Sequence, residues 1–320
     1  MALALVTSLV TLVFAGFVLD QWRRRRRAFQ LVWGLGLLWY ACAAGIEFVG
    51  GTSGWNAGLF RGWYLFGAVL TAGWLGAGTL YLLERTRFGY FAAASVLIGG
   101  LISLALVKQY PGSAFNGWST LVASVLFAAA VSVTTWRTPR TTGHVAFAFL
   151  IAGSVLAAVV VLGAGVNTAA YVDPGTQAPV AAAMAPEARV VNLPFNVGGG
   201  MTLIVGALFS AYVYMPKKRV LHGPLGLAAL VNFFASLPLA LRAASAGRLS
   251  SRVPATILIA IGASVATGAT GLERFGQSWL LHAGELLGIL LIFAGFLISE
   301  DVFQHVPGLG RKVWPGPVSG

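Results

Sequence analysis

Charged residues are scarce in this chain. Of its 320 residues, 9% are charged and 58% are hydrophobic, whereas a soluble globular chain carries roughly a quarter charged residues. The sequence therefore lacks the polar surface that a water-soluble domain needs. About ten spans of about 20 residues each would use most of the chain, and this leaves no room for an appended soluble catalytic domain such as a kinase or a nucleotidase.

Cysteine is almost absent as well. The single cysteine, Cys42, excludes an intrachain disulfide, an iron–sulfur cluster held by cysteines and a zinc site made of thiolates. It lies in an apolar run, which predicts a packed thiol. The chain also lacks a glycine-rich phosphate loop, an H-E-x-x-H zinc helix and a Gly-x-Ser-x-Gly elbow. These absences favour a protein that is not an enzyme and carries no cofactor.

Long uncharged runs are what the sequence has instead. A helix that crosses the hydrocarbon core needs about 20 apolar residues. Nine runs of at least 19 residues contain no charge, and a tenth, 275–299, is interrupted by Glu285 alone. The nine runs are 1–19, 28–46, 62–83, 88–107, 109–136, 141–172, 190–216, 220–241 and 253–272.

These runs predict an all-α fold, a polytopic integral membrane bundle of about ten transmembrane helices. We expect residues 1–300 to form one transmembrane domain with an extracytoplasmic loop at 164–199, and residues 301–320 to form a short polar tail. The first apolar run has no basic residue before it, and basic residues follow it. This order favours a retained first helix with its N-terminus outside over a cleavable signal peptide.

The net charge of +12 comes from basic residues that gather on one side of the predicted spans. Cytoplasmic loops are rich in Lys and Arg, so this charge indicates topology, and we expect no binding to nucleic acid. With Arg23–Arg27 inside, ten spans give thirteen basic residues inside and eight outside. If residues 222–241 instead enter and leave on the same side, the totals become seventeen and four. The sequence leaves both counts open: ten spans, or nine spans and a re-entrant hairpin.

Forty-one glycines indicate close helix packing, because small residues let helices approach one another in lipid. Gly284 and Gly288 have the G-x-x-x-G spacing, and Gly73, Gly76 and Gly78 form a similar patch. Both patches fit packing within the chain or the face of a homo-oligomer.

Two short segments resemble each other. Residues 45–50 and 271–276 both contain two glycines and a glutamate, and each closes one apolar run before the next. With ten spans the two copies would have opposite orientation, as in the inverted repeats of transporters. With nine spans they would be parallel.

Polar side chains within the spans are the candidates for chemistry. A charge at the centre of a span is costly, so an intramembrane acid is a functional candidate by default. Glu285 is such an acid, and His282 lies three positions earlier on the same helix face. The pair could bind a proton, a cation or a substrate group, or it could form an interhelical hydrogen bond that only stabilises packing. Asn232 is a third polar candidate, within the run 220–241.

Two other arrangements are open from the sequence. Glu47 ends the second run and Arg61 begins the third, a spacing that predicts an ion pair at the outer interface. His144, His222 and His282 lie near the starts of three runs, and with ten spans they would share one side of the membrane. They are then weak candidates for a metal or haem site.

The sequence favours two functional classes. One is a transporter of a small solute or a lipid that uses a buried acid. The other is a membrane-embedded sensor or a scaffold that docks a membrane or soluble protein partner. A redox subunit with haem or metal is a third hypothesis. In every case we expect an integral protein of a bacterial-type plasma membrane, with the lipid bilayer as its surroundings.

Overall fold

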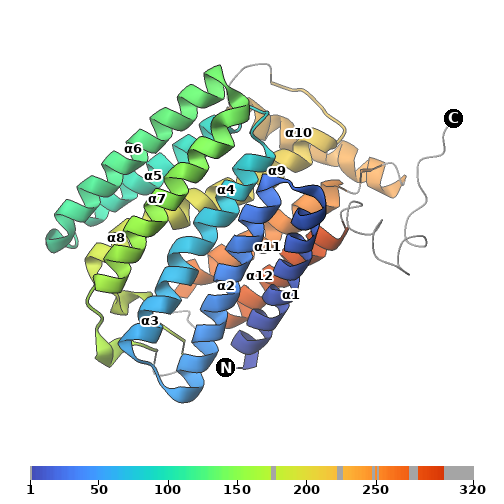
Figure 1. The fold of residues 1–320 in the computed structure, drawn as a ribbon. Helices are drawn as coiled ribbons and strands as arrows, with labels where there is room; N and C mark the ends of the chain where they lie inside the picture. The colour runs from blue at the N-terminus through green and yellow to red at the C-terminus, as the bar shows by residue number, and fades with distance from the viewer. Residues whose placement is uncertain are drawn as a thin grey trace.

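The computed structural model describes residues 2–173, 178–221, 226–246, 249–250, 252–273 and 280–298. These residues form a bundle of long helices that run side by side (Figure 1). No strand occurs in the described ranges, where the only β-type pairing is two isolated bridges in the loop before α8. The predicted all-α membrane bundle is confirmed.

Nine spans in the described part of the chain are long and apolar enough to cross a membrane. Two of them consist of an α-helix, a π-helical segment and a second α-helix in direct succession. The elements of the nine spans are α1 (Ala2–Arg25), α2 (Ala28–Ser53), α3 (Ala57–Trp63) with η1 (Tyr64–Thr71) and α4 (Ala72–Leu82), α5 (Gly89–Leu106), α6 (Ala114–Arg137), α7 (Thr142–Gly163), α8 (Pro186–Leu193) with η6 (Pro194–Gly198) and α9 (Gly199–Tyr214), α11 (Arg252–Glu273) and α12 (Leu280–Ile298).

The helix α10 (Gly226–Ser245) is not one of these spans. Met215 after α9, Ala240 of α10 and Val253 of α11 pack in one hydrophobic cluster. The side chain of Arg252 also donates a hydrogen bond to the Tyr214 hydroxyl, at 2.8 Å. The end of α9 and the start of α11 therefore lie at the same end of the bundle, and α10 sits against them without crossing (Figure 1).

This placement decides between the two span counts. We name the end of the bundle that carries Arg23–Arg25 and the start of α2 the arginine end, and the opposite one the far end. With α10 at the arginine end, α11 runs toward the far end and α12 runs back. Within the described residues, nine helical spans therefore cross the bundle, and the single helix α10 takes the place of a re-entrant hairpin.

The nine-span arrangement also fixes the relative orientation of the two similar segments. Residues 45–50 lie near the end of α2, and residues 271–273 close α11. Both helices run from the arginine end to the far end, so the two segments are parallel and do not form an inverted repeat. Residues 274–276 of the second segment lie outside the described residues.

The glycine patches are used for packing within the chain. A methyl group added to Gly284 or Gly288 would collide with Ala269 or Ala266 of α11, respectively. Added to Gly76 of α4, it would meet the backbone of Gly199, the first residue of α9. These faces are covered by neighbouring helices, so they are not free to form a homodimer.

Two details differ from the sequence expectations. The helix α8 begins at Pro186, so the long connection at the far end is shorter than 164–199 and ends at residue 185. Pro186 suits this start, because proline has no N–H to donate and its φ is already helical. Cys42 is exposed on α2 and is not packed in the interior.

Candidate functional site

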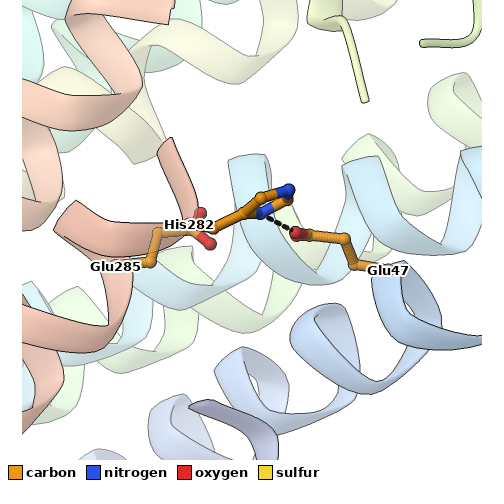
Figure 2. Close-up of side chains that lie close together, drawn as sticks. All are labelled: Glu47, His282 and Glu285. Atoms are coloured by element: carbon orange, nitrogen blue, oxygen red, sulfur yellow. Dashed lines mark ion pairs between the residues drawn. The ribbon is translucent and has the colours of Figure 1, made fainter. Parts of the chain in front are cut away.

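Three ionisable side chains from α2 and α12 meet between these helices. We name Glu47, His282 and Glu285 the acid–imidazole cluster (Figure 2). The Nδ1 atom of His282 contacts Oε1 of Glu47. One ligand atom from each of the three side chains lies within 4.8 Å of the other two. The sequence pairing of His282 with Glu285 thus extends to a third member, Glu47.

Helix geometry places these residues together. His282 and Glu285 are three positions apart, so they share one face of α12. Tyr40 lies seven positions before Glu47 on α2, and its hydroxyl donates a hydrogen bond of 3.2 Å to the backbone carbonyl of Glu285. This bond ties the two helices beside the cluster.

The cluster lies inside the far half of the span. At 1.5 Å per residue, Glu47 is about 9 Å before the end of α2, and Glu285 is about 8 Å after the start of α12. Glu47 is 1% exposed, and the side chain of His282 is 11% exposed. Both ring nitrogens of His282 and Oε1 of Glu47 are buried without a well-oriented hydrogen bond. Contact without good hydrogen-bond geometry is costly for buried polar groups.

No Lys or Arg among the described residues forms an ion pair with Glu47, whose partner is His282. An ionised Glu47 therefore places a negative charge in the interior, with His282 as its neighbour. Burying such charge is expensive unless a cation neutralises it. The arrangement is suited to holding a proton or a metal ion between α2 and α12.

The predicted ion pair between Glu47 and Arg61 does not form. Arg61 donates two hydrogen bonds to the carbonyl of Ala164, from Nε at 3.0 Å and from Nη2 at 2.7 Å. Ala164 follows the last residue of α7, where helix carbonyls have no partner within the helix. Arg61 therefore caps α7, and Glu47 faces α12.

The other predicted candidates lie elsewhere. The amide of Asn232 accepts hydrogen bonds from the backbone N–H groups of Val220 and Leu221 and donates one to the Leu221 carbonyl. This links α10 to the chain after α9, at the arginine end. Asn232 is therefore a packing contact, separate from Glu285. His222 lies outside the described residues.

His144 lies in the first turn of α7 at the arginine end, where its Nδ1 lies 2.9 Å from the Tyr81 hydroxyl. Partial burial raises the pKa of nearby Glu84, and the charges of His144 and Arg85 offset part of this rise. We name Glu84 and His144 the second carboxylate–imidazole pair on the ground of this electrostatic influence. His144 and His282 thus lie at opposite ends of the bundle. The predicted shared metal site of these two histidines is corrected accordingly.

Sequence reasoning missed the role of Glu47. A signal for it was present, because Glu47 lies six residues before the end of an otherwise apolar helix. Its partner, His282, could not be predicted, because it comes from a helix more than 230 positions away in the chain.

A second feature is a cavity whose lining includes residues of the outer helices α6 and α7. We name it the lateral cavity. Its volume is about 440 Å³, which lies within the range of about 300–1,000 Å³ typical of ligand pockets. Its walls come from α4, α5, α6, α7 and the η6–α9 segment, and most of its lining residues are apolar. Leu156 and Val159 both line the cavity and are exposed on the outer surface, at 65% and 68%.

The few polar groups of the lateral cavity are mostly satisfied by their own helices. Ser124 donates to the carbonyl of Thr120, and Thr202 donates to that of Gly198. Asn116 and Ser119, near the start of α6, form the polar end of the lining. The cavity is therefore a mostly apolar pocket with polar side chains near the start of α6.

Searches against protein-family models, curated proteins and solved structures find no match to this chain. The structure itself supports an integral membrane protein, because nine described spans are long and apolar enough to cross a bilayer.

Proposed function

We propose that the protein is a membrane transporter that moves a lipid, or a solute with a lipid-like chain, through the lateral cavity. The observation that carries this proposal is the shape of the cavity. On α7 the lining extends from Ala146 to Val160, a distance of about 21 Å along the helix. One leaflet of a bilayer has a hydrocarbon thickness of about 15 Å, half of the whole core.

An acyl chain of a bilayer lipid therefore fits the cavity lengthwise. The walls are mostly apolar, as such a chain requires, and the exposed lining residues Leu156 and Val159 of α7 would give a lipid chain access from the hydrocarbon. Asn116 and Ser119 provide hydrogen-bonding groups at the far end, where a polar headgroup would lie.

The acid–imidazole cluster gives this transporter an ionisable site. Acidic and histidine side chains within spans mark ion pathways and proton relays in pumps and transporters. A cation bound there would change the charge between α2 and α12, next to the Tyr40 bond that joins them. Transport is then expected to respond to the charge of this site.

The test is lipid movement in proteoliposomes. Purified protein is reconstituted with a phospholipid that carries a fluorescent label, and dithionite then bleaches the label in the outer leaflet. We expect the protein to increase the bleached fraction beyond one half. The variant Ala123→Trp fills the cavity from α6 and should abolish the increase, since Ala123 lines the cavity. The variant Val122→Trp is the matched control, because Val122 is 55% exposed and does not line the cavity.

Native mass spectrometry separates transport from mere binding. A lipid that stays bound in the cavity while the labelled lipid remains in its leaflet would refute transport and favour the sensor or scaffold class. Equal activity of both tryptophan variants would show that lipid does not use this cavity.

A further inference from the structure

We propose that Glu47, His282 and Glu285 form a binding site for a divalent transition-metal ion of the Zn²⁺ type. This inference deepens the proposed function, since it names the cation of the cluster. Metal binding is measured without transport, so the two proposals can fail separately.

Geometry supports a common ion. Bonds from Zn²⁺ to imidazole nitrogen and carboxylate oxygen are about 2.0–2.2 Å long, which sets ligand atoms about 3.4 Å apart around a tetrahedral ion. The ligand atoms of the cluster lie within 4.8 Å of one another. Small rotations of three side chains would therefore close them on one ion, with the fourth position open for water.

Two buried groups lack the partners that a purely structural role would supply. Glu47 is 1% exposed, and its Oε1 makes no well-oriented hydrogen bond. The Nε2 atom of His282 is also buried without a hydrogen-bond partner. A histidine that binds a metal uses one ring nitrogen as the ligand, and the other usually donates a hydrogen bond to a second group. In this structure the Nδ1 atom of His282 already lies against the carboxylate of Glu47.

Charge supports the same ion class. Glu47 is 1% exposed, and a cation beside a carboxylate lowers the cost of burying its charge in a medium of low dielectric. Two carboxyl groups and an imidazole are also a donor set that suits a divalent ion. The hydrogen bond from Tyr40 to the Glu285 backbone holds α12 in place against α2.

The donor set selects among metals. Imidazole together with carboxylate suits Zn²⁺ and neighbouring first-row ions. Ca²⁺ takes six to eight oxygen ligands, and Mg²⁺ keeps several waters in an oxygen shell. Both are poorly matched by a site in which one of three ligands is nitrogen.

The experiment uses the full-length protein in detergent micelles and the metal alone. Titration calorimetry with Zn²⁺ measures affinity and stoichiometry, and Co²⁺ provides a visible absorption band from its coordination shell. We expect one ion per chain and no comparable binding of Mg²⁺. Removal of one ligand in Glu285→Gln should weaken Zn²⁺ binding at least about tenfold, because even changes around metal ligands cost that much. Glu47→Gln should weaken it by a similar or larger factor.

The matched control is the double variant Glu84→Gln/His144→Gln, which removes the other carboxylate–imidazole pair and should leave affinity unchanged. Glu285 is only partly buried, so its variant decides the outcome if Glu47→Gln does not fold. The proposal is overturned if the folded wild-type chain takes up neither Zn²⁺ nor Co²⁺ stoichiometrically. Equal affinity of the wild-type chain and Glu285→Gln would overturn it too.

Discussion

The bundle contains a carboxylate–imidazole pair at each end, and the two pairs have different surroundings. At the far end, Glu47 contacts His282 between α2 and α12, and Glu47 is almost completely buried. At the arginine end, Glu84 is partly buried, His144 is exposed, and Arg85 adds positive charge nearby. The same two residue types thus form a solvated pair near helix ends at the arginine end and a buried ionisable site in the far half of the bundle.

The comparison shows what burial adds. A solvated acid and imidazole can each exchange a partner for water, and exposed pairs contribute little to stability. Between α2 and α12 neither residue has this alternative, so each depends on the other or on a bound cation. Three measurements test this difference between the two pairs.

The largest effect is expected from removing one acid. The variant Glu47→Ala leaves His282 buried without its partner, which should lower the free energy of unfolding by about 1–3 kcal/mol. The counterpart Glu84→Ala should change it by about 0.5 kcal/mol or less. Thermal unfolding in micelles, followed by tryptophan fluorescence, measures both. Equal losses in the two variants would contradict the difference in burial.

Double-mutant cycles give a smaller but more specific effect. The cycle of Glu47→Gln and His282→Gln should yield a coupling free energy of about 1 kcal/mol or more, since the residues are in contact. The cycle of Glu84→Gln and His144→Gln should yield less than about 0.5 kcal/mol. A coupling near zero in the first cycle would mean that Glu47 and His282 do not stabilise each other.

The smallest effect concerns pH at the arginine end. Partial burial raises the pKa of Glu84, so the folded protein holds this proton more tightly than the unfolded chain does. The resulting stabilisation is complete below the ordinary pKa of glutamate and is lost as the pH rises through the higher pKa of the folded state.

The variant Glu84→Gln should therefore lose less stability than the wild-type chain between about pH 4 and about pH 7, by about 0.5 kcal/mol or less. Melting temperatures over this range test the sign. Parallel curves for the two proteins would show that Glu84 has the same proton affinity in both states.

Much of the fold could be predicted from the sequence, because the apolar composition of each segment is enough to identify it as a span. The uncharged runs predicted the helices, and the spacing of Gly284 and Gly288 predicted a close helix face. The pairing of His282 with Glu285 depended only on local helix geometry, and both do lie in one cluster.

The rest depended on how distant helices assemble. Whether the run that contains α10 crosses the membrane decides at which end α12 begins. With ten spans, His282 would lie at the end of the bundle opposite to Glu47, and the cluster could not form. The lateral cavity is also beyond local reasoning, since a gap between helices has no sequence signal of its own.

The backbone contact between Gly76 of α4 and Gly199 of α9 restricts how this molecule can change shape. Where two main chains are in contact without side chains between them, the helices cannot tilt closer together without a steric clash. Half or more of the most apolar window in each of these two spans is buried, compared with 22% in the spans of α6 and α7. Because α4 and α9 are packed this closely, we expect any widening of the lateral cavity to come from movement of α6 and α7.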